Sequence, residues 1–169
     1  MRVYHGSDQI VRSPEIRRNE RGRDFGFGFY TTTIKEQAER WAVRTAFIHS
    51  KRTGNAAEPH ISVFEFDTDK LAGLSVKRFE EPSMEWLDLV IKCRSDISYQ
   101  HTFDIVIGKI ANDSVGETID YVVSGIMRKE DALQRLIFEH INDQVCFCSN
   151  KALAKITFVE SYAIRKSRE

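Results

Sequence analysis

The amino-acid sequence predicts a single α+β domain, and three observations support this fold class. The chain has 169 residues, and a chain of that size folds as one domain that buries about two thirds of its unfolded surface. Hydrophobic residues make up 41% of the sequence and charged residues 30%, which is typical of a globular protein. Strand-like and helix-like segments are mixed without strict alternation, which favours α+β over a doubly wound parallel sheet.

The first half of the chain is expected to contain three strands and one long helix. Strand-like runs occupy residues 2–5 and 61–66, and an aromatic strand follows a glycine-punctuated turn within residues 24–32. Thr33 and Glu36 have the spacing of a capping box, which predicts a helix that ends at the stop signal of residues 52–55. The positions expected to form its buried face are Ile34, Ala38, Trp41, Ala42, Thr45 and Ile48.

The second half is expected to be richer in helices. Helices are predicted over residues 82–94, 115–124, 129–141 and 151–155, and strands over residues 103–110, 144–149 and 156–164. In the strand that begins at residue 144, alternation points Val145 and Phe147 into a core and turns Gln144 to the opposite side.

The charge of the whole chain does not indicate a polyanionic or membrane partner. Lys and Arg together number 25, as do Asp and Glu, so the formal net charge is zero. The N-terminal residues lack the basic and apolar regions of a signal peptide, and no apolar run is long enough to span a membrane. We therefore expect a cytoplasmic protein without a membrane partner, in which any nucleic acid would bind a local patch.

The three cysteines, Cys93, Cys146 and Cys148, are expected to be free thiols. A single residue separates Cys146 from Cys148, and this spacing is poorly suited to a mutual disulfide. A Cys-x-Cys pair alone also lacks the four-ligand spacing of a zinc site. We expect no bound metal and interpret the cysteines as packing residues.

Three short motifs contain the candidate functional residues. They are Tyr4-His5-Gly6-Ser7, Gly28-Phe29-Tyr30-Thr31-Thr32 and Asp143-Gln144-Val145-Cys146-Phe147. A dinucleotide-binding Rossmann fold is not supported, because strand-like residues and not a helix follow Gly26-Phe27-Gly28.

In this order the motifs resemble the ADP-ribosyltransferase superfamily, in the branch with a His-Tyr-Glu triad that includes diphtheria-toxin-like enzymes and poly-ADP-ribose polymerases. They are also similar to a small bacterial family of unknown function, family 3990, which is assigned to that superfamily. Its pattern has a Tyr-His-Gly-Ser start and an Asp-Phe-Gly-x-Gly-Phe-Tyr-x-Thr segment. This second resemblance covers nearly the whole chain.

The resemblance implies a split, mainly antiparallel sheet whose two halves clasp NAD, and transfer of ADP-ribose with release of nicotinamide. Such a site has to orient the nicotinamide and stabilise an oxocarbenium-like ribose. By this resemblance, His5 would bond the ribose on the adenosine side, and the backbone of Gly6 would hold the nicotinamide amide. Tyr30 would stack on the nicotinamide ring.

Further residues complete the implied NAD site. Thr31 or Thr32 would supply a hydroxyl beneath the ribose, and Gly28 would let the backbone approach the ligand closely. Arg23, with Arg21, ends an arginine-rich run over residues 12–23 that would grip the pyrophosphate or the phosphates of a nucleic-acid acceptor. The alternative for this run is a solvated loop.

Gln144 occupies the position of the superfamily's glutamate. Glutamine accepts a hydrogen bond from a ribose hydroxyl, but it carries no charge and cannot act as a base. The exchange is expected to weaken transition-state stabilisation by about 1–2 kcal/mol, or about tenfold in rate. The acceptor would then be activated by another group, for which Asp104 and Asp113 are candidates, or be intrinsically nucleophilic. Asn112 and Asp113 follow a strand, where loops often carry function.

The three triad residues also have structural interpretations. His5 can end a strand with its ring bonded to the backbone, Tyr30 can be a core aromatic, and Gln144 can be a polar residue at the start of a strand. Alternation places Tyr30 on the face opposite Phe27 and Phe29, which favours a ring that faces a cleft.

The resemblance therefore implies an NAD-dependent ADP-ribosyltransferase, similar to bacterial toxins and phage-defence effectors, with NAD as the co-substrate. Its acceptor would be a protein or a nucleic acid, and a cognate antitoxin or inhibitor protein is an expected partner. Two alternatives stay open. One is an NAD glycohydrolase that transfers ADP-ribose to water, and the other is a non-catalytic module that binds NAD or ADP-ribose.

Overall fold

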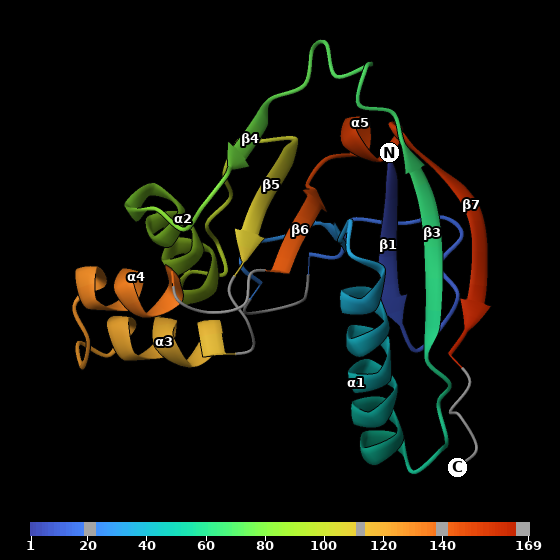
Figure 1. Ribbon diagram of the computed structural model, residues 1–169, viewed down its shortest axis with the longest axis horizontal. Coiled ribbons are helices and arrows are strands. Elements are labelled where there is room, and N and C mark those ends of the chain that lie inside the picture. The colour runs from blue at the N-terminus through green and yellow to red at the C-terminus, as the bar shows by residue number, and fades with distance from the viewer. Residues whose placement is uncertain (19–22, 111–113, 138–141, 165–169) are drawn as a thin grey trace.

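The computed structural model describes residues 1–18, 23–110, 114–137 and 142–164. Within these residues seven strands form two mainly antiparallel sheets, and five helices flank them (Figure 1). The predicted α+β class and the single domain with a mainly antiparallel sheet are confirmed. The elements are β1 (Arg2–Ser7), β2 (Phe29–Thr31), α1 (Lys35–Thr53), β3 (His60–Phe66), β4 (Val76–Phe79), α2 (Met84–Ser95), β5 (Ile105–Ile110), α3 (Ser114–Val123), α4 (Lys129–Ile137), β6 (Asn142–Phe147), α5 (Asn150–Leu153) and β7 (Ile156–Ala163).

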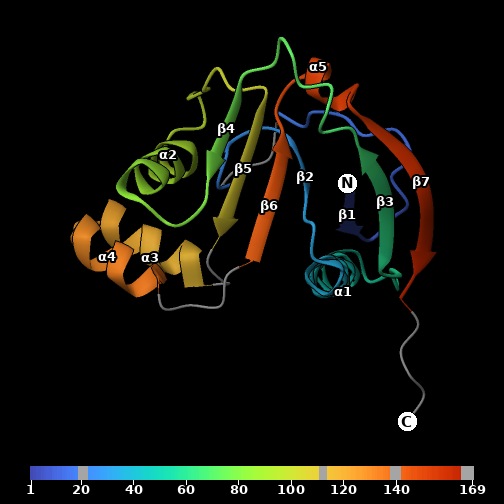
Figure 2. The ribbon, with the colours of Figure 1, turned by 45° about the horizontal axis from the view of Figure 1, so that its top comes forward.

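The sheet is split between β1 and β2. One half has the strand order β1-β3-β7 and the other β2-β6-β5-β4, and the halves lie side by side (Figure 2). In the described residues an isolated bridge joins them at Tyr4 and Thr32. There the N–H of Tyr4 donates to the Thr32 carbonyl at 2.8 Å, and the N–H of Thr32 donates to the Tyr4 carbonyl at 3.0 Å. The bridge therefore joins the two halves at Tyr4 and Thr32, and no further backbone pairing among the described residues closes the split between β1 and β2.

Two apolar clusters cover the two faces of the four-stranded half. Side chains from both halves form the first cluster: Val3, Phe29, Phe64, Phe66, Ile105, Val145, Phe147 and Ala152. The second cluster packs α2, α3 and α4 against the other face, and Figure 2 shows these helices on the side of β4. As alternation predicts, Val145 and Phe147 belong to the first cluster and Cys146 to the second. The second half of β6, from Val145 to Phe147, is therefore buried on both faces, directly after Gln144.

Helix α1 packs closely on β1, and its buried face is narrower than the sequence predicts. Its buried residues are Ala38, Ala42 and Ala46. A Cβ atom on Gly6 would collide with the Ala38 carbonyl and would lie 2.9 Å from the Ala42 nitrogen, so only glycine fits between strand and helix. The expected inward positions Trp41 and Ile48 are instead 45% and 54% exposed. The prediction for these two residues is wrong, because so close a packing leaves room only for small side chains.

The predicted capping box at the start of α1 is also wrong. The N-cap residue is Ile34, and no side chain caps the helix there. Thr33 instead donates from its N–H and its hydroxyl to the Asp143 carboxylate. The Thr33 hydroxyl, which the sequence pattern assigned to the helix cap, therefore binds Asp143 on β6. At the other end, α1 terminates as predicted, with Gly54 in the left-handed conformation (φ 76°).

The remaining elements are found near their predicted positions, with one exception. Strand β4 was not predicted, and it pairs in parallel with β5 through the register Val76 to Ile105. Strand β6 covers residues 142–147 where residues 144–149 were expected, since the chain leaves the sheet after Phe147 and Ser149 caps α5. Residues 138–141, the end of the predicted 129–141 helix, lie outside the described residues.

Candidate functional site

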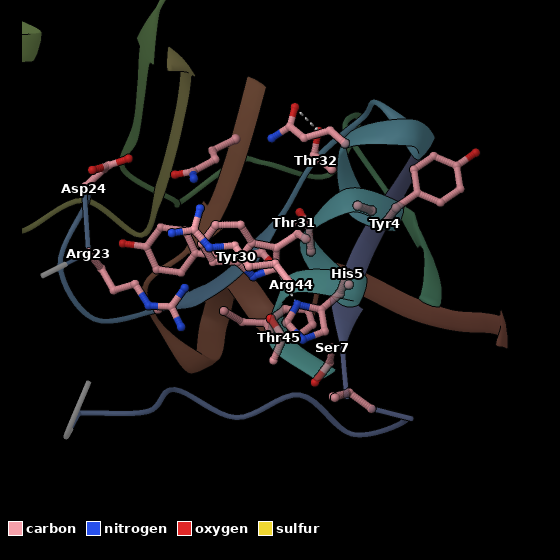
Figure 3. A pocket seen from close by; sticks show the side chains of 18 of the residues that line it. Tyr4, His5, Ser7, Arg23, Asp24, Tyr30, Thr31, Thr32, Arg44 and Thr45 are labelled. Carbon is pink, nitrogen blue, oxygen red and sulfur yellow. Dashed lines mark hydrogen bonds between the residues drawn. The ribbon is translucent and has the colours of Figure 1, made fainter. Parts of the chain in front are cut away.

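A cavity of about 540 Å³ opens at the split between the two halves of the sheet. This volume lies in the range of about 300–1,000 Å³ that is usual for small-molecule and cofactor sites. All eight residues that the sequence analysis assigns to the site line this one cavity: His5, Gly6, Arg23, Gly28, Tyr30, Thr31, Thr32 and Gln144. Figure 3 shows His5, Arg23 and Tyr30 around the same opening. Residues separated by up to 139 positions are thus brought together at one place.

The ring of His5 ends the pairing between the halves. Beyond the bridge of Tyr4 with Thr32, the next hydrogen-bonded pair of an antiparallel ladder would join Gly6 to Tyr30. The carbonyl of Tyr30 instead lies 2.7 Å from Nδ1 of His5. Because a carbonyl only accepts, Nδ1 is protonated, and Nε2 is the acceptor in the neutral form of the ring. The structural interpretation of His5, a ring bonded to backbone, is therefore correct for Nδ1.

Gly6 turns its backbone polar groups towards the cavity. The N–H and C=O groups of Tyr4 point away from β3, to Thr32, and those of Gly6 point the same way because peptide directions alternate along a strand. Among the described residues no backbone hydrogen bond joins Gly6 to β2. The result is one donor and one acceptor, side by side at a lining residue of the cavity.

Tyr30 presents its ring to the cavity while its hydroxyl is held by the turn before β2. The hydroxyl accepts from the Phe25 N–H at 3.0 Å and donates to the Gly26 carbonyl at 2.6 Å. Burial, with Cys146 and Asp24 nearby, raises the pKa of Tyr30 well above its usual range, so the hydroxyl stays a donor. The Arg23 guanidinium lies over the ring, 5.3 Å from its centroid. Tyr30 and Phe29 face opposite sides, as predicted.

The loop before β2 is fixed by features that sequence analysis did not single out. Asp24 is buried and forms an ion pair with Arg94 of α2, at 2.6 Å from both Nε and a terminal guanidinium nitrogen. A Cβ atom on Gly28 would collide with the Cys146 sulfur and lie 2.9 Å from the Phe147 carbonyl oxygen. Close packing against β6 therefore explains the glycine at position 28 without any ligand.

The two threonines of the second motif line the cavity, but their hydroxyls have protein partners. Thr31 donates to the Val145 carbonyl at 2.9 Å in a buried position. Thr32 contacts the Asp143 carboxylate and the Gln37 amide oxygen, and it accepts from the Ile34 N–H at 3.0 Å. Both threonine hydroxyls hold β2 to β6 and to the start of α1, which argues against the expected bond to a ribose.

Gln144 lines the cavity and has an unsatisfied side-chain acceptor. Its Oε1 atom is buried and has no hydrogen-bond partner in the part of the chain that the structure describes. A buried acceptor without a partner costs about 1–3 kcal/mol. Such atoms are rare in folded proteins, and this one belongs to a residue that lines the cavity.

Residues of α1 add charge that the sequence analysis did not assign to the site. Arg40, Trp41 and Arg44 line the cavity. Arg44 is four residues from Arg40 and three from Trp41, and this spacing was a usable signal, because positions three and four apart are neighbours on a helix surface. With Arg17, Arg23 and Arg94, the described lining has five arginines against three carboxylates, those of Asp8, Glu15 and Asp24. The cavity therefore favours an anionic ligand.

The remaining candidates are not part of the described cavity. Asp104 accepts from the Ser75 N–H at 2.9 Å and from the Ser149 hydroxyl at 2.5 Å. These bonds, led by that from Ser149, lower its pKa and give it a structural role. Arg21, Asn112 and Asp113 lie outside the described residues.

Two further kinds of feature are absent from the described residues. No group of three His, Cys, Asp or Glu side chains is arranged to hold a metal ion. No described helix combines the length and the apolar character needed to cross a membrane. The three cysteines are free thiols.

Comparison with known proteins gives one match. Residues 1–158 match the model of a family described as "Protein of unknown function (DUF3990)". No curated protein and no solved structure matches the chain.

Proposed function

The chain belongs to the DUF3990 family, whose function is unknown, and from its cavity we propose that it is an NAD-dependent ADP-ribosyltransferase of the ADP-ribosyltransferase superfamily. NAD would enter the split in the sheet with its nicotinamide end against Gly6 and Tyr30. The acceptor would be a protein or a nucleic acid.

The observation that carries the proposal is the pair of backbone groups that Gly6 turns into the cavity. The carboxamide of nicotinamide has one carbonyl acceptor and one NH₂ donor, which match one N–H and one C=O group. The contact of Gly6 with Ala38 and Ala42 fixes this stretch of backbone before any ligand arrives. A preorganised donor and acceptor orient the ring without loss of freedom on binding.

The ring of Tyr30 supports the same position for nicotinamide. The nicotinamide of NAD⁺ is a flat cation, and the face of an aromatic ring attracts flat cations. In the structure the flat cationic group over Tyr30 is the Arg23 guanidinium, 5.3 Å from the ring centroid. Nicotinamide would take this place, and Arg23 would turn to the diphosphate.

The charge of the cavity suits the diphosphate of NAD. Of the five lining arginines, Arg94 is paired with Asp24, and Arg40 and Arg44 stand one helical turn apart on α1. Guanidinium groups bind phosphate oxygens through two parallel hydrogen bonds. Arg23, Arg40 and Arg44 would therefore hold the two phosphates between β2 and α1.

Gln144 would accept a hydrogen bond from a ribose hydroxyl, which would satisfy its buried Oε1 atom. In the reaction, the bond between the ribose C1′ and the nicotinamide nitrogen breaks, and nicotinamide leaves with the bonding electrons. The acceptor then forms a bond to C1′ and loses its proton. Because Gln144 has no charge, it orients the ribose but does not offset the positive charge on the oxocarbenium.

The neutral side chain at position 144 also favours one second candidate. A module that binds NAD and leaves nicotinamide attached needs the donor and acceptor groups of the cavity but no carboxylate. The fate of nicotinamide distinguishes this module from an enzyme, and the fate of ADP-ribose distinguishes transfer from hydrolysis.

The experiment uses the full chain with NAD labelled on its adenylate phosphate, in cell lysate with and without nuclease. Nicotinamide release, label in macromolecules and NAD binding by calorimetry are all measured. Tyr30→Leu is compared with Tyr121→Leu, because Arg135 lies over Tyr121 at 5.9 Å from the ring centroid while Tyr121 is outside the described cavity lining.

Labelled macromolecules, lost in Tyr30→Leu and kept in Tyr121→Leu, would support transfer at this site, and the nuclease arm would name the acceptor class. Release of nicotinamide without label would indicate a glycohydrolase, and binding without release would indicate the module. If the wild-type protein neither binds nor cleaves NAD, the proposed function is wrong.

A further inference from the structure

Cys146 and Cys148 lie in contact at the end of β6, with their sulfur atoms 3.4 Å apart. Cys146 is in the strand and fully buried, whereas Cys148 follows the strand and is partly exposed. Because the chain leaves the sheet after Phe147, the Cys148 side chain turns back towards the Cys146 sulfur and carbonyl. The third thiol, Cys93, is a residue of α2.

We propose that Cys146 and Cys148 form a redox-active dithiol, in which a hydroperoxide oxidises Cys148 and Cys146 then closes a reversible disulfide. Neither cysteine belongs to the described lining of the NAD cavity, although Cys146 pairs with Tyr30 between β6 and β2. The proposal does not depend on the proposed transferase activity.

The surroundings of Cys148 favour its thiolate, which is the reactive form of cysteine. Its sulfur lies 3.4 Å from the Cys146 sulfur, and a hydrogen bond from Cys146 to the charged form lowers the pKa of Cys148, with smaller contributions from His101 and the Val106 backbone. The bond from Cys146 is the largest cause that lowers the pKa of Cys148, to about 6, despite burial. Burial instead raises the pKa of Cys93 to about 12, so Cys93 stays a thiol. Cys148 is therefore the cysteine that we expect to act as the nucleophile.

His101 is held in a position that supports this role. Its Nε2 lies 2.9 Å from the Phe25 carbonyl, and its Nδ1 lies 3.2 Å from the Phe103 nitrogen. Burial works to lower the pKa of His101, but hydrogen bonds to Cys148 and to Phe25 raise it overall. Because both ring nitrogens have backbone partners, His101 is fixed in place next to Cys148.

The oxidation balances in two steps. The Cys148 thiolate attacks a hydroperoxide, ROOH, breaks its O–O bond, and becomes a sulfenic acid as an alkoxide leaves and takes up a proton. The Cys146 thiol then attacks the Cys148 sulfur, forms the S–S bond and releases water. The dithiol loses two electrons, and the hydroperoxide is reduced to an alcohol and water.

The sulfur atoms have to move about 1.4 Å closer to reach the S–S bond length of about 2.0 Å. Two residues separated by one position in extended chain lie near the upper limit of Cα separation for a disulfide. The bond will therefore be strained and easily reduced, which is typical of regulatory disulfides and not of structural ones.

The test treats the reduced full chain with hydrogen peroxide and follows the intact mass. Wild type should lose the mass of two hydrogen atoms, recover it with dithiothreitol, and keep Cys93 open to alkylation after unfolding. Peptide mapping should place the new bond between Cys146 and Cys148. Cys93→Ser is the matched control and should behave like wild type.

Two variants separate the steps. Cys146→Ser keeps a hydroxyl donor but cannot close the bond, so it should stop at one added oxygen that a sulfenic-acid reagent traps. Cys148→Ser should react at least about tenfold more slowly than wild type. Oxidation that involves Cys93, passage of wild type directly to sulfinic acid, or equal rates in wild type and Cys148→Ser would overturn the proposal.

Discussion

The imidazole Nδ1 of His5 lies 2.7 Å from the carbonyl oxygen of Tyr30, where the Gly6 N–H would lie if β1 and β2 continued to pair. One side chain therefore ends the ladder between the two halves of the sheet and leaves two backbone groups at the opening. The ring of His5 also packs against Phe29, with centroids 4.5 Å apart, and Phe29 belongs to the core shared by both halves. The position of the opening is thus set by the core.

Replacing His5 by Asn should separate the two functions of the imidazole. The Asn amide nitrogen can stand in for Nδ1 and keep the bond to Tyr30, but Asn has no equivalent of Nε2. We expect His5→Asn to fold with near wild-type stability and to lose NAD turnover, whereas His5→Ala loses turnover and about 1 kcal/mol of stability. Urea denaturation and nicotinamide release measure the two effects. Normal turnover in His5→Asn would remove the imidazole from the NAD site.

Replacing Tyr30 by Phe should cost stability and spare ligand binding. The hydroxyl binds the Phe25 N–H and the Gly26 carbonyl, so its loss leaves buried backbone groups without a partner. We expect about 1–3 kcal/mol less stability, with NAD affinity within a few-fold of wild type because the ring remains. Calorimetry on Tyr30→Phe and Tyr30→Leu checks this. If both variants lose binding equally, the ring face is not the contact.

Local sequence patterns correctly predicted features that depend on neighbouring residues. They failed for features that depend on contacts with residues distant in sequence. The alternation along β6 correctly separated Val145 from Cys146, because the period of a strand is local. The capping box failed because Asp143, 110 positions from Thr33, takes both the hydroxyl and the N–H of that residue. Strand β4 was missed because its pairing with β5 is parallel and short, at four residues.

The candidate site was predicted in part for the same reason. Motif order identified eight lining residues, since each motif is a short run of chain. Motifs do not show that the Thr31 and Thr32 hydroxyls have protein partners, or that Arg94 of α2 reaches the buried Asp24. These contacts join segments far apart in sequence, and only the packed fold reveals them.

Three substitutions at Gln144 should have different effects. Its buried Oε1 lacks a partner among the described residues, so Gln144→Leu should leave the unliganded protein as stable as wild type or more so. Gln144→Leu and Gln144→Ala should both slow NAD turnover by about 10–100-fold, the cost of an unpaired ribose hydroxyl. Gln144→Glu should raise turnover by about tenfold, because a carboxylate stabilises the oxocarbenium. Unchanged turnover in all three would place Gln144 outside the site.

Adding one methyl group at Gly6 should destabilise the protein, because the new Cβ atom meets the backbone of α1 at Ala38 and Ala42. We expect Gly6→Ala to lose about 1–3 kcal/mol or more. Gly116→Ala is the matched control, since a Cβ atom there meets only the end of the Arg94 side chain, at 3.1 Å. Alanine also favours the α3 helix by about 0.5–1 kcal/mol. Equal denaturation midpoints for the two variants would contradict this account of the packing.

The pH dependence of alkylation tests the environment of Cys148 without any ligand. The hydrogen bond from Cys146 lowers the pKa of Cys148 to about 6, so its thiolate fraction rises as the pH increases through that value. The rate with iodoacetamide, followed by peptide mapping, should therefore level off near neutral pH, whereas an ordinary cysteine still accelerates above about pH 8.

Removing the donor in Cys146→Ala should shift the profile upward and slow the reaction at pH 7 by about tenfold. Cys146→Ser keeps a hydroxyl donor and should leave the profile close to wild type. A wild-type rate that rises only above about pH 8, as in an ordinary thiol, would show that Cys146 does not activate its neighbour.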